Sequence, residues 1–96
     1  MAKKMPEEHW YVLVMEDDGP AFVSGTGDHH MAYWNKNEKP KEFSKEWALD
    51  MMKGLTWNGF TAYPVCSPIE LDHQPYNYQK WQLTWKERED ERVYEL

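Results

Sequence analysis

One stretch, Phe43–Phe60 (FSKEWALDMMKGLTWNGF), constrains the fold of this 96-residue chain most, because it has the pattern of a single amphipathic helix. Ser44 is a good N-cap, since its hydroxyl can accept a hydrogen bond from an amide of the first turn. The apolar residues then recur on one helical face, namely Trp47, Ala48, Met51, Met52 and Leu55. Gly54 or Asn58-Gly59 can end the helix, and the later stop is favoured because Leu55 continues the apolar face.

Three further stretches have the composition of strands. His9–Glu16 (HWYVLVME) contains an apolar run without a polar break, which is typical of a central strand covered on both faces. The turn residues at 17–20 predict that Ala21–Ser24 returns as the second strand of a hairpin. Thr61–Cys66 is rich in aromatic and β-branched residues, so a strand is expected after the helix. Met31–Trp34 can form a short strand or a helical turn, and four residues do not decide between them.

The C-terminal stretch has two competing periodicities. Trp81, Leu83 and Trp85 alternate as in a strand, but Tyr78, Trp81 and Trp85 also have the i, i+3, i+7 spacing of a helix. Lys86–Arg92 (KEREDER) consists of good helix formers whose charges can pair at i, i+4. We therefore expect a helix over about Tyr78–Arg92.

Together these elements predict a small α+β domain, in which a small antiparallel sheet (hairpin, helix, strand) carries one helix on a face and a second helix follows at the C-terminus. A chain of this length forms one domain, with Met1–Glu8 frayed. The helix Ser44–Trp57 is expected to be the cover of the sheet, so function is expected away from it. The expected core consists of Trp10, Val12, Val14, Phe22, Trp47, Ala48, Met51, Leu55 and Val65.

Charge and composition narrow the classes of function. The formal net charge of −6 argues against sequence-independent binding to nucleic acid or to an anionic membrane. With no apolar run of membrane-spanning length, no signal-peptide pattern in Met1–Glu8 and a single cysteine, a cytoplasmic location is expected. Six Trp and six Tyr exceed what so small a core can hold, so some of them are expected at a contact surface. An equally weighted alternative is that they cover a thin two-layer fold.

Asp28-His29-His30 is the candidate metal site of the chain. Imidazole and carboxylate are good ligands for zinc, copper or iron, and His9 or His73 could complete the set after folding. The three adjacent residues match no spaced motif such as H-E-x-x-H, however. A polar loop that contains histidines is therefore the favoured interpretation.

Two other local patterns are weaker. Gly25-Thr26-Gly27 lacks the third glycine of a dinucleotide fingerprint and the Lys-Ser/Thr pair of a phosphate loop, so nucleotide binding is not expected. Cys66 ends a predicted strand, where a buried and inert thiol is expected. No catalytic residue and no cofactor is predicted.

The order of the elements has a parallel in other small proteins. The run YVLVME, a turn, AFVSG, then KPKEF, SKEWALDMMKGL, NGF and TAYPV resembles small single-domain α+β proteins of Gram-positive bacteria and their phages, most of them uncharacterised. The resemblance covers about Trp10–Val65 and implies a fold and a mobile-element setting, with no catalytic residues. The long aromatic end from Tyr76 departs from the shorter members.

Two classes of function follow from these observations. The first is a non-enzymatic protein-binding module that acts through exposed aromatic side chains, with Tyr78, Trp81 and Trp85 as candidate contact residues. Its partner would be another protein or a second copy of the chain. The alternative is a small metal-binding protein or metal-dependent enzyme that uses Asp28, His29 and His30.

Overall fold

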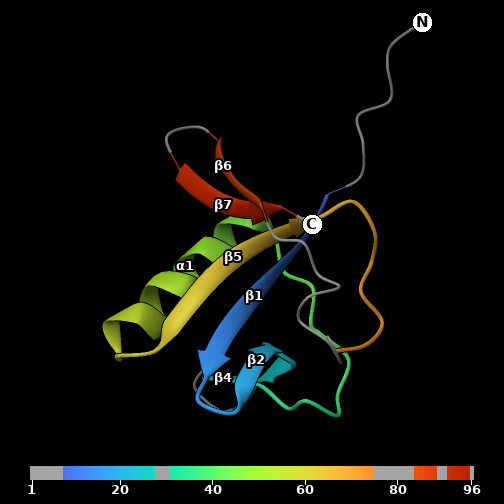
Figure 1. The fold of residues 1–96 in the computed structure, drawn as a ribbon, viewed down its shortest axis with the longest axis vertical. Helices are drawn as coiled ribbons and strands as arrows, with labels where there is room; N and C mark the ends of the chain where they lie inside the picture. The colour runs from blue at the N-terminus through green and yellow to red at the C-terminus, as the bar shows by residue number, and fades with distance from the viewer. Residues whose placement is uncertain (1–7, 28–30, 75–83, 89–90, 96) are drawn as a thin grey trace, which may run out of the picture.

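The computed structural model describes residues 8–27, 31–74, 84–88 and 91–95, and its central element is a twisted sheet (Figure 1). Within these residues the sheet has five strands in the order β2-β1-β5-β7-β6. They are β1 (His9–Glu16), β2 (Gly19–Phe22), β5 (Thr61–Ser67), β6 (Thr84–Arg88) and β7 (Glu91–Glu95). Neighbouring strands are antiparallel, except that β5 and β7 run parallel. The predicted α+β domain with one helix on a sheet is therefore confirmed, and the sheet is mostly rather than wholly antiparallel.

The helix α1 (Lys45–Trp57) begins and ends where its sequence predicts. Ser44 is the N-cap, and its hydroxyl accepts from the Trp47 N–H at 3.2 Å. Asn58 is the C-cap, and Gly59 follows with φ of +92°. Gly54 therefore lies inside the helix, and the later of the two predicted stops is confirmed.

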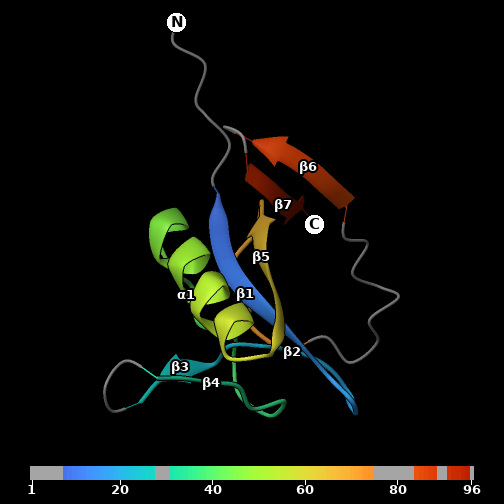
Figure 2. The same ribbon diagram turned by 90° about the vertical axis from the view of Figure 1, so that its left-hand side faces the viewer.

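One face of the sheet is covered by α1 (Figure 2). Alternate residues of β1 point to this face because side chains alternate along a strand. Trp10, Val12 and Val14 meet the helical residues Ala48, Met51 and Leu55 there, in one apolar cluster. This cluster is the larger part of the core.

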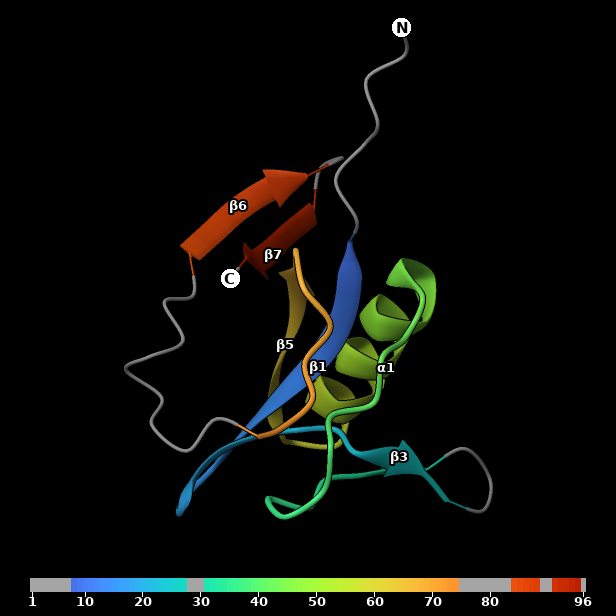
Figure 3. The same cartoon turned by 90° about the vertical axis from the view of Figure 1, so that its right-hand side faces the viewer.

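The other face of the sheet is covered by the segment 68–74, orange in Figure 3. Leu71 of this segment packs with Tyr11 and Leu13 of β1, and with Phe22 and Val65 of the neighbouring strands. The central strand β1 is thus buried on both faces, as its continuous apolar sequence predicts.

A two-stranded hairpin lies below the C-terminal end of α1 (Figure 2). It consists of β3 (Gly25–Thr26) and β4 (Ala32–Tyr33), which are antiparallel. The stretch Met31–Trp34, whose sequence is compatible with a short strand or a helical turn, therefore forms a strand at its centre. The predicted hairpin strand Ala21–Ser24 is shifted and occupies Gly19–Phe22 instead.

The helix predicted over about Tyr78–Arg92 is wrong for the described part of that stretch, which forms β6 and β7. The two strands pair in register from Thr84↔Glu95 to Arg88↔Glu91, and β7 joins the main sheet through Val65↔Tyr94. The described residues of KEREDER pair with each other or with Val93 across β6 and β7, and only Tyr94 and Glu95 pair with distant β5, so strand pairing overrides the local helix propensity. Residues 78–83 and 89–90 lie outside the described part, as does most of the predicted frayed start.

Trp47 is the one predicted core residue that is wrong, because its side chain is 40% exposed. The helical stripe that faces the sheet is centred on Ala48, Met51 and Leu55, and Trp47 lies at its edge. The other eight predicted core residues are buried. No helix in the described ranges is long and apolar enough to cross a membrane.

The two glycines at the end of α1 should respond oppositely to alanine. Gly54 has helical geometry and an added Cβ would meet nothing within 4 Å, so Gly54→Ala should raise the free energy of unfolding by about 0.5–1 kcal/mol. Gly59 has φ of +92°, so Gly59→Ala should lower it by about 1–2 kcal/mol. Urea denaturation of both variants measures the difference, and a loss of stability in Gly54→Ala would contradict the helical placement.

Candidate functional site

A groove of about 650 Å³ lies between α1 and the β3–β4 hairpin. Figure 2 shows the two elements side by side, with the hairpin under the end of the helix. Three parts of the chain line the groove: the helix, the hairpin and the turn after the helix. The described lining residues are Trp47, Asp50, Met51, Gly54 and Leu55 of the helix, Met31, Ala32 and Trp34 of the hairpin, and Asn58 and Phe60 of the turn.

The orientation of the hairpin follows from a close contact between its strands. Gly25 pairs with Tyr33, and the Tyr33 ring lies so close that a Cβ at position 25 would clash with it. With Tyr33 on that side, the neighbouring residues Ala32 and Trp34 point the other way and pack against the helix-side core. This alternation directs Trp34 toward the groove.

Ring contacts hold two walls of the groove in place. Trp34 and Phe60 meet edge to face, with centroids 5.1 Å apart, and the Trp34 Nε1–H donates to the Glu16 carboxylate at 2.9 Å. Trp47 meets Phe43 edge to face at 5.0 Å. Edge-to-face pairs of this kind stabilise a packed arrangement by about 0.5–1.5 kcal/mol. The aromatic walls are therefore preformed rather than free to collapse inward.

The described lining of the groove is mostly apolar, with Asp50 and Asn58 as its polar side chains. Asp50 is the only charged side chain among its described lining residues. Within the described ranges its carboxylate forms no ion pair and no side-chain hydrogen bond. The site can therefore offer apolar contact together with a single negative charge.

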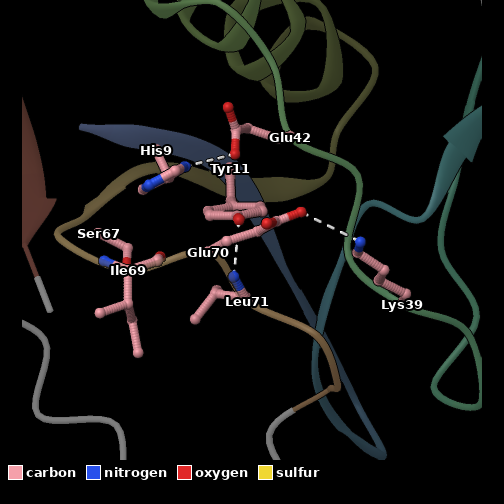
Figure 4. Close-up of polar contacts among 8 residues, drawn as sticks. All are labelled: His9, Tyr11, Lys39, Glu42, Ser67, Ile69, Glu70 and Leu71. Atoms are coloured by element: carbon pink, nitrogen blue, oxygen red, sulfur yellow. Dashed lines mark hydrogen bonds and ion pairs between the residues drawn. The ribbon is translucent and has the colours of Figure 1, made fainter. Parts of the chain in front are cut away.

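A second cavity, of about 590 Å³, has a polar lining that includes Tyr11, Lys39, Glu42 and Glu70. Figure 4 shows how these side chains pair. The His9 Nδ1 lies 2.6 Å from a Glu42 carboxylate oxygen, and the Lys39 ammonium donates to Glu70 at 3.1 Å. Two carboxylates of this cavity, Glu42 and Glu70, thus pair with basic side chains of other segments.

Tyr11 is the buried centre of this polar network. Its hydroxyl accepts from the Leu71 N–H at 2.8 Å and its side chain is fully buried. Burial raises the pKa of the phenol above 10.0, the Leu71 N–H opposes this rise, and the negative charges of Glu42 and Glu70 add to it. The network attaches the segment 68–74 to the sheet, which is a structural role.

The candidate metal residues Asp28, His29 and His30 lie outside the described residues. The two histidines proposed to complete their set have nearby carboxylate partners, His9 with Glu42 and His73 with Asp72. Across the described ranges no group of three or more potential metal ligands occurs. The metal interpretation stays a prediction.

Of the three candidate contact residues at the C-terminus, only Trp85 is described, since Tyr78 and Trp81 lie outside. Trp85 packs against Tyr94 with centroids 3.9 Å apart and meets Tyr63 edge to face at 5.8 Å. The Arg92 guanidinium lies 5.0 Å from its ring centroid. These contacts join the β6–β7 hairpin to β5, and the role of Trp85 in binding stays a prediction.

Sequence reasoning missed the groove because it assigned the helix to the sheet alone. Met51 and Leu55 do cover the sheet, but they also form the floor of the groove. One signal was available, namely a glycine within the helix, where alanine is more stable. Cys66, predicted to be buried, is buried.

No family model, curated protein or solved structure matches this chain. The resemblance to small proteins of Gram-positive bacteria and their phages therefore stays a prediction. Function is inferred from the geometry of the chain itself.

The hydrogen bond of Tyr11 should affect both the free energy of unfolding and the pH dependence of that free energy. Tyr11→Phe leaves the buried Leu71 N–H without its acceptor and should lower the free energy of unfolding by about 1–3 kcal/mol near pH 7. The pKa of Tyr11 is raised in the folded protein. The stabilisation that its neutral side chain contributes is therefore fully present below pH 10 and is lost as the pH rises through the folded pKa. The difference between wild type and variant should therefore narrow above about pH 10.

Urea denaturation at several pH values measures this, with Tyr63→Phe as the control. Tyr63 is half-buried and its hydroxyl has no hydrogen bond within the described ranges, so its loss should change stability by less than about 0.5 kcal/mol. Equal effects of the two variants would contradict a special role for the Tyr11 hydroxyl.

Proposed function

We propose that this protein is a non-enzymatic protein-binding module that holds an apolar segment of another protein in the groove between α1 and β3–β4. The observation that supports this most is the convergence of exposed apolar side chains there. Met31 is 70% exposed, and Trp47 and Phe60 are each 40% exposed, although they come from three different parts of the chain. Exposed apolar side chains that gather at one concave place indicate a contact site.

The size and lining of the groove suit a peptide segment. Its volume falls in the range of about 300–1,000 Å³ that is typical of ligand sites. Met51 and Leu55 form an apolar floor, and methionine at the rim adapts to differently shaped partners. Removing a large apolar side chain from water contributes roughly 1.5–3 kcal/mol, so an occupant that covers the rim has a sufficient driving force.

A partner other than a second copy is favoured by charge. In a twofold dimer the same surface meets itself, so the Asp50 carboxylate of one copy would face the same acidic groove in the other. The chain already has a net charge of −6, and close like charges are unfavourable. A segment with positive charge meets no such repulsion.

Catalysis receives little support from the groove. General acid–base and nucleophilic mechanisms place at least two interacting side chains around the reacting atom. Asp50 is the only titratable side chain among the described lining residues. The alternative function, metal binding by Asp28, His29 and His30, rests on the sequence alone.

The proposal is tested with a random peptide library displayed on phage, using peptides of about 15 residues, or four helical turns. Peptides selected on the wild type should bind Met31→Gln at least about tenfold more weakly, because the variant replaces an apolar rim side chain with an uncharged polar one. Titration by intrinsic tryptophan fluorescence measures the affinity, and amide shifts in NMR map the contact.

Ile69→Gln is the matched control. The exposed fraction of Ile69, 64%, is similar to that of Met31, but Ile69 does not line the groove. The same substitution at Ile69 should therefore leave the affinity for the peptide unchanged. Selected peptides that bind both variants as well as the wild type would overturn the proposal. Light scattering of the free protein tests whether a second copy binds, and a dimer that Met31→Gln dissociates would also overturn the choice of partner.

A further inference from the structure

Gly54 is not explained by the fold. It lies within α1, its φ is not among the positive values found for Gly19 and Gly59, and an added Cβ would meet nothing within 4 Å. Neither backbone conformation nor close packing in the described ranges therefore requires a glycine. Alanine would make the helix more stable at this position.

What Gly54 does provide is space in the groove. The residue is exposed and lines the groove, so the absence of a side chain leaves the helix backbone bare at the floor. The side chains beside it, Met51 and Leu55, are large and apolar. An occupant can therefore approach the helix more closely at Gly54 than at either neighbour.

Asp50 lies one helical turn before Gly54 on the same side of the helix. Both residues line the groove, and a step of four residues along the helix places them about 6 Å apart along the axis. Aspartate is a poor helix former in the interior of a helix, so it does not serve helix stability there. Its exposed carboxylate has no ionic partner within the described ranges.

From these two residues, and resting on the proposed function, we infer the chemistry of the segment that the groove binds. It carries a Lys or Arg that pairs with Asp50, and an apolar side chain about 6 Å away that seats on Gly54. That separation equals the i, i+4 spacing of a helix or the i, i+2 spacing of a strand. The positive charge complements both the carboxylate and the net charge of the chain.

The first test uses groove-dependent peptides, that is, peptides from the phage library whose binding is weakened by the substitution of Met31. Their sequences test the inference. They should contain Lys or Arg at one of these spacings from a large apolar residue, and their binding should weaken as salt increases. Groove-dependent peptides that are neutral or acidic would overturn this inference while leaving the proposed function intact. A library without groove-dependent peptides would instead overturn the proposed function.

Substitution of Gly54 separates stability from binding. Gly54→Ala should raise the melting temperature of the protein and yet lower its affinity for the selected peptides about fivefold or more. Gly54→Gln should abolish peptide binding, because its side chain would fill the floor of the groove. Thr56→Ala is the matched control, because it also improves helix propensity at an exposed position but does not line the groove. Unchanged affinity in both Gly54 variants would overturn the role of Gly54.

Substitution of Asp50 tests the charge. Asp50→Asn should weaken a Lys- or Arg-bearing peptide about tenfold and reduce its salt dependence, while a peptide with Gln in place of the basic residue should bind both proteins alike. Glu46→Gln is the control, since Glu46 is an exposed acidic residue of the same helix outside the groove. Equal effects of the two substitutions would show only a general electrostatic attraction and would overturn the pairing with Asp50.

Discussion

β1 is hydrogen-bonded along both edges, to β2 and to β5, and residues on both of its faces are buried. Because side chains alternate across a strand, such a strand requires two separate covers. The helix α1 covers Trp10, Val12 and Val14, while the segment 68–74 covers Tyr11 and Leu13. The hydrogen bond from the Leu71 N–H to the Tyr11 hydroxyl attaches the segment 68–74 to the sheet. It also gives the buried Leu71 N–H an acceptor.

The groove results from the way in which α1 covers the sheet. A helix contacts a sheet along one stripe, and in α1 that stripe is centred on Ala48, Met51 and Leu55. The flank of the helix beside the stripe faces the short β3–β4 hairpin, where Trp47 remains partly exposed and Asp50 and Gly54 line an open groove. Small domains have too little chain to cover every apolar flank, and here the uncovered flank has a shape and a charge of its own.

The candidate site was only partly accessible to sequence reasoning. The surplus of aromatic residues correctly predicts exposed ones, and Trp47 and Trp57 are exposed in the structure. Which aromatic residues gather could not be predicted, because Trp34 and Phe60 are neighbours only through the packing of the hairpin on the end of the helix. Assigning Met51 and Leu55 to the sheet was right but incomplete, since periodicity identifies an apolar face without saying how much of it is covered.

The amino-acid sequence by itself determined the elements whose signals are local. The bounds of α1 follow from the Ser44 cap and the Asn58-Gly59 stop, and β1 follows from a continuous apolar run. Only the tertiary structure decided the C-terminal strands, the exposure of Trp47 and the existence of the groove. The physical reason is that local propensity does not encode these contacts: β6 and β7 pair with each other while β7 also joins distant β5, and the groove exists only where residues 31–34 meet residues 47–60.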